Sequence, residues 1–207
     1  MTVPTTPTGP PARCDGPHRD TRSQVLPPCT SAVTWRRVPE TANHRCGGVM
    51  FGDEIVLGPL PKGITLANEG VQKRIWNILG HTYYMKAASD SSFAFETYDP
   101  PGTGVPPHVH PTQDEHIYVL EGVFTLYLDG QWETAGPGDT VRMPRNLPHA
   151  YYNRSEAPTR ALFWVSPSGK LAQLFDKLHD LEDPAEVVRL SAECDVNFLP
   201  PGSVEGA

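Results

Sequence analysis

Four side chains that can bind a metal ion fall within residues 108–149. His108 and His110 are separated by one residue, Glu115 follows soon after, and His149 comes much later. Residues i and i+2 of a β-strand point to the same face, so His108 and His110 are expected to point together. Imidazole nitrogens with one carboxylate suit a divalent transition metal ion. The sequence therefore predicts a metal site, provided that neighbouring strands bring Glu115 and His149 to the two histidines.

The segments around these residues are typical of short β-strands. Residues 92–98 alternate between two faces, and Asp129-Gly130 between two apolar runs is a strong signal for a two-residue hairpin. Apolar pieces at 32–35, 47–61 and 74–87 also have lengths that suit strands better than helices. At least seven short strands at close spacing favour a β-sandwich or barrel, so the fold class expected is all-β.

Only the C-terminal part changes its hydrophobic period. Apolar residues recur there at helical spacing behind Ser168, which is the expected N-cap of a first helix. Asp183, followed by Pro184 and Glu186, predicts the start of a second helix. Both helices are expected to cover one face of the sheet without taking part in chemistry.

Length and composition divide the chain into a domain and an appendage. The 207 residues include 23 Pro, and residues 1–45 are Pro-rich with almost no apolar periodicity. Such a segment cannot bury enough apolar surface to offset the entropy of ordering, so a disordered N-terminal tail is expected. The β-barrel is then expected at 46–167 and a helical extension at 168–207.

Charge and hydropathy argue against several classes of partner. Seventeen Lys and Arg against 24 Asp and Glu give a net charge of −7, which disfavours nucleic acid. No stretch approaches the roughly 20 apolar residues that span a bilayer, and the N-terminus lacks the apolar core of a secretion signal. We therefore expect no membrane partner and a cytoplasmic location. The four Cys are far apart and form no CxxC pair, which supports neither a cysteine zinc site nor a disulfide framework.

The spacing of the ligand candidates resembles the two conserved motifs of the cupin superfamily. The first motif is matched by Gly102, His108, His110, Glu115 and Gly122. The second motif is matched by Gly138, Pro144, His149 and Asn153. Asn146 departs from the pattern, which has Gly there, but Asn tolerates a left-handed backbone better than other non-glycine residues.

This resemblance to single-domain, quercetinase-like cupins implies a small antiparallel barrel or jelly roll with short C-terminal helices. It implies one metal ion bound by His108, His110, Glu115 and His149. The ion could be Fe, Ni, Mn, Cu, Co or Zn, because the ligand types do not select among them. It also implies a homodimer that pairs through sheet faces. The run from Ile117 to Leu120 is apolar on both faces, which suits such a dimer and equally suits a strand buried between two sheets.

A complete ligand set favours an enzyme. The leading hypothesis is a metal-dependent oxidoreductase, a dioxygenase that combines O2 with an aromatic or enolisable hydroxy-ketone of the secondary-metabolite type. Glu115 would act as general base. The alternative is an isomerase, lyase or polyketide-type cyclase that uses no O2, in which Glu115 or Tyr151 moves a proton. A non-catalytic small-molecule binder is the third alternative.

The neighbours of the ligand candidates leave further alternatives open. Strand alternation points His116 away from Glu115, which favours a surface position or one behind the ligands. Glu121 is expected to be a solvated charge. Tyr151 shares the parity of His149 and could point into the barrel or pack in the core. Arg142 could bind an anionic substrate group or pair with an acid on the outer face, and the second alternative is favoured. Sequence alone does not separate pocket wall from core for Trp76, Tyr83, Tyr84, Phe124, Phe163 and Trp164.

Overall fold

The computed structural model describes residues 60–207. The predicted disordered tail at 1–45, the strand-like piece at 32–35, nearly all of the piece at 47–61 and the start of the barrel at residue 46 lie outside these residues. So do Cys14, Cys29 and Cys46, while Cys194 is a buried free thiol. Within the described part, no helix is both long enough and apolar enough to cross a membrane.

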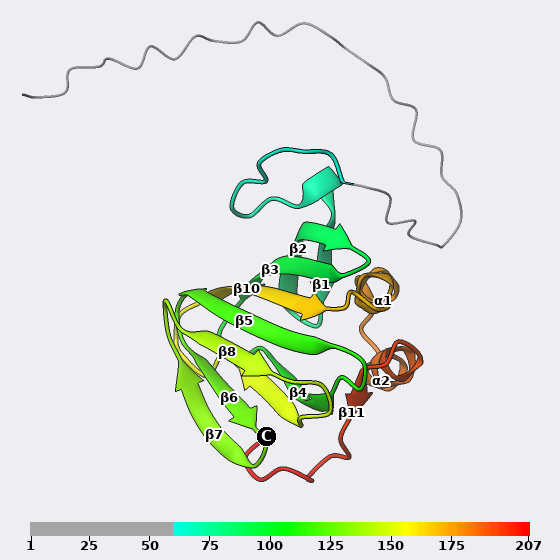
Figure 1. The fold of residues 1–207 in the computed structure, drawn as a ribbon. Helices are drawn as coiled ribbons and strands as arrows, with labels where there is room; N and C mark the ends of the chain where they lie inside the picture. Colours follow the sequence, from blue (N-terminus) through cyan, green and yellow to red (C-terminus); the bar gives the residue numbers. More distant parts are fainter. Residues whose placement is uncertain (1–59) are drawn as a thin grey trace, which may run out of the picture. The chain divides into compact units, whose positions relative to one another are not determined.

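Two antiparallel sheets form the core of the described part (Figure 1). The six-stranded sheet has the order β1-β2-β3-β10-β5-β8. Its strands are β1 (Ile75–Ile78), β2 (His81–Ser89), β3 (Ser92–Asp99), β10 (Thr159–Ser166), β5 (Asp114–Glu121) and β8 (Thr140–Met143). The five-stranded sheet has the order β11-β4-β9-β6-β7. Its strands are β11 (Asn197–Phe198), β4 (Gly104–Val109), β9 (His149–Tyr152), β6 (Phe124–Leu128) and β7 (Gln131–Ala135). The predicted all-β antiparallel jelly roll is confirmed.

Strand alternation places one face of each sheet in a shared hydrophobic core. In β10, buried and partly buried residues alternate along all eight positions, with Ala161, Phe163 and Val165 inside. Phe95 of β3 stacks on Phe163, with ring centroids 5.4 Å apart. Phe124 of β6 meets Phe163 edge to face from the other sheet. These contacts join the two sheets through aromatic side chains, which bury large apolar areas.

The turns follow the chemistry that the sequence predicts. Asp129 and Gly130 connect β6 to β7, with φ of 44° and 92°. A two-residue hairpin requires such positive φ values, because only then does the turn match the twist of the two strands. Asn146 has φ 64°, so the residue that departs from the cupin motif adopts the left-handed conformation expected of the glycine it replaces.

The C-terminal segment forms two short helices and a strand. The first helix, α1 (Leu171–Leu178), begins later than predicted, and Lys170 rather than Ser168 occupies its N-cap position. Ser168 is buried and its hydroxyl donates to the carbonyl of Asp90, so it is not available as a cap. The second helix, α2 (Pro184–Glu193), is capped as predicted, because the Asp183 side chain accepts from the backbone N–H of Ala185.

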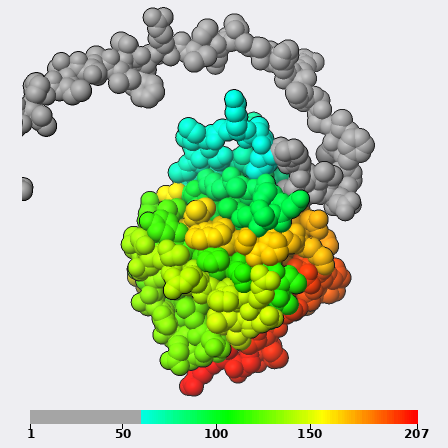
Figure 2. Space-filling model, viewed as in Figure 1, coloured from blue at the N-terminus to red at the C-terminus, as the bar shows by residue number. Residues whose placement is uncertain are grey.

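Both helices and the chain end cover one end of the two sheets. The helix α1 lies beside β1, and α2 lies beside β11 (Figure 1). The chain then passes under the barrel toward β6 and β7, as the red surface in Figure 2 shows. The Trp132 indole of β7 donates to the carbonyl of Glu205, which ties the last residues to the five-stranded sheet. The helices therefore close the barrel end at which the ligand candidates lie.

Candidate metal centre

The structure brings together all four predicted ligands. His108 lies on β4, His110 directly follows that strand, Glu115 lies on β5 and His149 begins β9. The register pairs His108 with His149, so neighbouring strands place these two imidazoles side by side. One potential ligand atom from each of the four residues lies within 4.8 Å of the others, and all four residues are buried. The cluster joins both sheets, because β4 and β9 belong to one and β5 to the other.

Backbone carbonyls fix the orientation of two imidazoles. The Nδ1 atom of His108 lies 2.8 Å from the carbonyl of Pro106, and Nδ1 of His149 lies 2.8 Å from the carbonyl of Leu147. A carbonyl only accepts, so each Nδ1 must carry the hydrogen. The Nε2 atom of each neutral ring is then left with a free lone pair, as metal ligation requires.

Gln113 performs the same task for His110, and sequence reasoning missed it. Its Nε2 amide group donates to the carbonyls of Pro167 at 3.0 Å and Ser168 at 2.6 Å. These two acceptors settle the orientation of the amide, so Oε1 must face His110, whose Nδ1 lies 3.2 Å away. The only signal in the sequence is a polar residue between His110 and Glu115.

The donor set fits a divalent cation. Oε2 of Glu115 lies 3.1 Å from Nε2 of His110 and 3.2 Å from Nε2 of His149. When the histidines are neutral, these atoms present lone pairs to one another with no hydrogen between them. Such a buried arrangement needs a positive charge at its centre, either a metal ion or a proton.

The electrostatics of the cluster agree with that requirement. Burial lowers the pKa of His108 well below its usual value, and the nearby His149 and His110 lower it further. For His110, burial is outweighed by the Glu115 carboxylate, which raises the pKa. Burial would raise the pKa of Glu115, but His110 and His149 hold it well below the usual range. The carboxylate is therefore ionised and His108 neutral, as a metal site requires.

Tyr151, the second predicted catalytic residue, lines the same cavity as His108, His110 and Glu115. This inner cavity has a volume of about 100 Å³ and is bounded mostly by apolar side chains, several of them from α1. The Tyr151 hydroxyl lies 3.1 Å from that of Tyr83 on β2. Burial raises the pKa of both phenols, so both stay protonated at neutral pH. Two hydroxyls carry two hydrogens and their mutual bond uses one, so one O–H remains free to donate.

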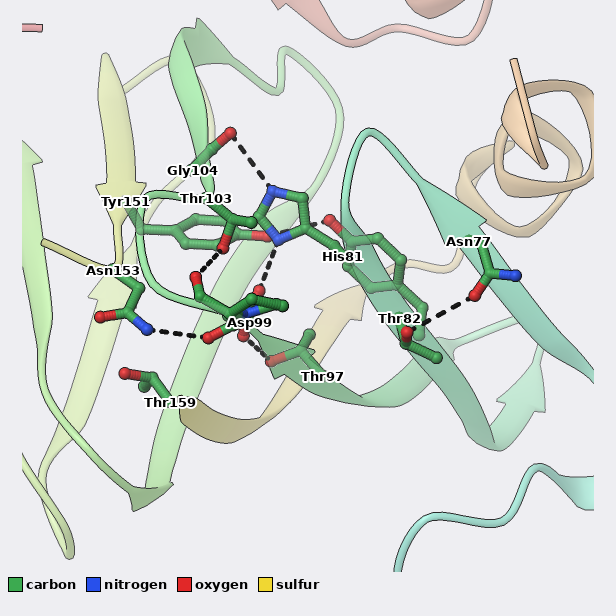
Figure 3. Close-up of polar contacts among 12 residues, drawn as sticks. Asn77, His81, Thr82, Thr97, Asp99, Thr103, Gly104, Tyr151, Asn153 and Thr159 are labelled. Atoms are coloured by element: carbon green, nitrogen blue, oxygen red, sulfur yellow. Dashed lines mark hydrogen bonds and ion pairs between the residues drawn. The ribbon is translucent and has the colours of Figure 1, made fainter. Parts of the chain in front are cut away.

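A buried His–Asp pair supports this tyrosine pair, and sequence reasoning missed it too. Nδ1 of His81 lies 2.5 Å from Oδ1 of Asp99, and its Nε2 lies 3.3 Å from the carbonyl of Gly104 (Figure 3). Thr97 donates to the other carboxylate oxygen of Asp99. The His81 ring stacks on Tyr83 and meets Tyr151 edge-on. Since both ring nitrogens have partners, His81 positions the tyrosines and is not a free ligand for the metal.

The structure places the remaining candidates outside the site. His116 points away from the cluster and stacks on Trp164, with ring centroids 5.0 Å apart. Arg142 is exposed on the outer face, opposite His116 in the register. Glu121 is exposed and pairs with Arg160 at 3.0 Å. Of the six aromatic candidates for the pocket wall, only Tyr83 lines the inner cavity. Trp76, Phe124 and Phe163 are core, and Tyr84 and Trp164 are partly buried.

Fold and site together define a class of protein: a two-sheet antiparallel barrel in which three histidines and a glutamate gather beside an internal cavity. Residues 95–165, which include all four ligand candidates, match the family model described as "Cupin domain". The chain therefore contains a domain of the cupin superfamily.

Two curated relatives and one solved structure illustrate the similarity. The Streptomyces glaucescens tetracenomycin polyketide synthase protein TcmJ is 30% identical over 67 residues, which cover 32% of this chain and 45% of the relative. The Bacillus subtilis quercetin 2,3-dioxygenase is 38% identical over 85 residues, which cover 41% of this chain and 25% of the relative. The chain thus spans less than half the length of either relative. An RmlC-like cupin from Shewanella frigidimarina is 19% identical with a TM-score of 0.46, covering 52% of this chain and 93% of that chain.

Proposed function

We propose that the protein is a metal-dependent oxidoreductase, specifically a dioxygenase that acts on an aromatic or enolisable hydroxy-ketone. The observation that carries the proposal is the complete set of four ligand side chains, of which His108, His110 and Glu115 line an apolar cavity. A ligand set that opens on a cavity is typical of catalytic sites, whereas structural sites are closed. The similarity to a quercetin 2,3-dioxygenase supports the choice of reaction.

The side chains divide the work between binding and proton transfer. His108, His110, His149 and Glu115 would hold a divalent transition metal ion, which supplies Lewis acidity and lowers the pKa of a hydroxyl that binds to it. Glu115 is ionised and accepts the hydroxyl proton of the substrate as general base. The tyrosine pair donates its free O–H to a second oxygen of the substrate and so orients it.

The apolar walls supply the remaining condition for this chemistry. Leu171, Leu174, Phe175 and Leu178 of α1 line the cavity and are buried. They exclude water, which strengthens electrostatic interactions within the site and protects reactive species from hydrolysis. Helix α1, which the sequence predicted only to cover a sheet face, therefore forms one wall of the proposed site.

Oxygen uptake tests the proposed reaction. The protein is stripped with a chelator, reloaded separately with Fe, Mn, Co, Ni, Cu or Zn, and supplied with a panel of phenols, hydroxy-ketones and diketones. We expect at least one metal form to consume O2 in proportion to the substrate lost. A Glu115→Gln variant, compared at equal metal content, should be slower by about 100-fold or more. Metal-loaded protein that consumes no O2 with any member of the panel contradicts the proposal.

A cyclase, isomerase or lyase that uses no O2 is the second candidate. It is favoured by the similarity to TcmJ and to the Streptomyces cyaneus polyketide synthase CurC, which is 30% identical over 67 residues. The same metal site would polarise a substrate carbonyl while Glu115 or Tyr151 moves a proton. Product formation under strict anaerobiosis would select this candidate over the dioxygenase.

We also propose that the protein forms a homodimer through the outer face of the six-stranded sheet. Tyr118 and Leu120 on β5 are 40% and 39% exposed on that face, where an apolar pair is unusual for a solvated strand. Light scattering should give twice the mass of the chain, and Leu120→Glu should shift it toward the monomer. A monomeric wild-type protein at tens of micromolar contradicts the dimer.

A further inference from the structure

An apolar groove lies next to the inner cavity and shares part of its wall. This outer groove has a volume of about 850 Å³ and is lined mainly by α2, β11 and the chain that follows. Leu79, Pro106, Val187 and Phe198 line both spaces, and we call this shared boundary the neck. We propose that the outer groove is a second substrate subsite, which holds the uncharged apolar body of a molecule whose chelating end lies at the metal centre. The inference rests on the function proposed above.

The volume of the inner cavity argues that a larger substrate must extend beyond it. An engineered cavity of roughly 150 Å³ in another protein accommodates benzene. The inner cavity, at about 100 Å³, is smaller, so it can hold the chelating edge of one ring but no second ring. An aromatic hydroxy-ketone that reaches the metal centre must leave its remaining rings outside, and the outer groove lies directly across the neck.

The lining of the two spaces defines the chemistry of the occupant. No Lys or Arg side chain lines either space within the described residues. The outer groove is lined by no charged side chain at all, and Val188 of α2 contributes an apolar surface that is 47% exposed. A phosphate or carboxylate on the substrate would find no counter-charge apart from the metal, and an anion without a partner is costly to desolvate. The subsite therefore selects a neutral apolar body.

Leu79 at the neck presents an exposed apolar side chain to both spaces. It occupies the turn between β1 and β2 with φ 48°, a left-handed conformation that Asn or Gly adopts more readily. Its side chain is nevertheless 48% exposed, so it is not kept there to fill the core. The two-residue turn requires the positive φ, and the exposed side chain is left available to contact a ligand that reaches from one space to the other.

The outer groove also lies largely outside the part of the chain that matches the cupin model. Only Pro106, Pro107 and Tyr152 of its lining fall within residues 95–165. The turn at Leu79, helix α2 and the C-terminal segment supply the rest. The subsite is thus built by the segments that surround the common domain.

A pair of probes with the same chelating group separates the two spaces. Maltol is a small 3-hydroxy-4-pyranone, and 3-hydroxyflavone carries the same hydroxy-ketone on an apolar three-ring body. Both are titrated under argon into the full-length protein loaded with Zn²⁺, which is redox-inactive, and binding is followed by probe absorbance. We expect 3-hydroxyflavone to bind at least about 30-fold more tightly than maltol, from burial of its additional rings.

Two variants on α2 assign that advantage to the groove. Val188→Glu adds a charge to the lining of the outer groove at an exposed position, and should weaken 3-hydroxyflavone binding about 10-fold or more while leaving maltol unchanged. Ala192→Glu is the matched control, because Ala192 is exposed on the same helix and lines neither space. Phe198→Ala, which removes one side of the neck, should also lower the preference for the larger probe.

Each result bears on a different part of the proposal. The subsite is overturned if the two probes bind with equal affinity. It is also overturned if the Val188→Glu variant binds 3-hydroxyflavone as tightly as the Ala192→Glu control does. Neither result contradicts the proposed function. If neither probe shows Zn²⁺-dependent binding, the chelating substrate class fails and the subsite fails with it.

Discussion

At the scale of single residues, the metal centre depends on the acceptors behind each imidazole as much as on the ligands. Two of these acceptors are backbone carbonyls, those of Pro106 on β4 and of Leu147 just before β9, but the third is a side chain. Gln113 is 1% exposed and uses all of its hydrogen-bonding groups except one lone pair. Outer partners of this kind hold metal-binding histidines in the correct tautomer and orientation.

Replacing Gln113 should weaken metal binding without removing a ligand. In Gln113→Leu, His110 loses the acceptor for its Nδ1 hydrogen, and the carbonyls of Pro167 and Ser168 lose the hydrogen bonds that the amide donates. We expect the dissociation constant for Zn²⁺, measured by competition with a chromophoric chelator, to rise about 10- to 100-fold. Gln131→Leu, at an exposed position on β7, is the control and should bind as the wild type does. Wild-type affinity in Gln113→Leu would show that His110 needs no such support.

A second residue-scale prediction concerns stability. Glu96 is 4% exposed on β3 and pairs with Arg160 and, at 2.9 Å, with Lys86. Burial alone would raise its pKa, but Arg160 and Lys86 lower it below the usual value. The contribution of the Glu96 carboxylate to the free energy of unfolding is therefore complete above the unfolded-state pKa, about 4.5. It is lost as the pH falls through the lower folded-state pKa.

Glu96→Gln should lower the free energy of unfolding at pH 7 by about 3 kcal/mol, because it leaves two cations without their buried partner. The difference from wild type should shrink as the pH is lowered below 4.5. Urea denaturation at pH 7 and at pH 3.5 measures both values, with Glu133→Gln on the exposed side of β7 as control. A difference that is the same at the two pH values contradicts this account of the charge.

At the scale of elements, the turns hold the strands in the register that the site requires. Gly122, between β5 and β6, has φ 76°, and a Cβ there would lie 2.8 Å from the carbonyl oxygen of Pro158. Gly138, before β8, has φ 93°, but a Cβ there would meet no atom within 4 Å. A side chain at either glycine would strain the backbone, but only a side chain at Gly122 would also contact neighbouring atoms.

Substituting alanine at each glycine gives a matched comparison. Gly138→Ala should lower the free energy of unfolding by about 1 kcal/mol, from the left-handed backbone alone. Gly122→Ala should lower it by about 3 kcal/mol or more, because β10 must also shift away from the new methyl group. Chemical denaturation of both variants checks the order, and equal losses would mean that the contact with Pro158 is relieved without cost.

The same scale explains how much of the structure the sequence could predict. Alternation and turn residues are local signals, so they predicted the strands, the hairpin at Asp129 and the shared direction of His108 and His110. The convergence of Glu115 and His149 with them was implied by the resemblance to cupins. The partnership of His81 with Asp99 depends on how β2 and β3 pair, and that of Gln113 with Ser168 joins positions far apart in the chain. The start of α1 was misplaced because tertiary contacts occupy the Ser168 hydroxyl. The groove escaped prediction because residues 199–207 have no regular period.

At the scale of the whole molecule, a metal ion would cross-link the two sheets. Glu115 belongs to the six-stranded sheet, whereas His108 and His149 belong to the five-stranded one. An ion that binds only the folded state, present at 100 times its dissociation constant, adds about 2.7 kcal/mol to the free energy of unfolding. For a domain of this size we expect Zn²⁺ to raise the midpoint of thermal unfolding by roughly 5–10 °C. A midpoint that does not move with saturating metal contradicts binding across the two sheets.

The central claim is that these four side chains hold one divalent transition metal ion, and metal content tests it most directly. Chelator-stripped protein is dialysed against Co²⁺ or Zn²⁺, and elemental analysis then gives the metal bound per chain, for wild type and for His149→Ala. We predict one ion per wild-type chain, and less than about a tenth of that in a His149→Ala variant whose circular dichroism is unchanged. Wild-type protein that retains no metal, or a folded His149→Ala variant that retains it fully, would contradict the account.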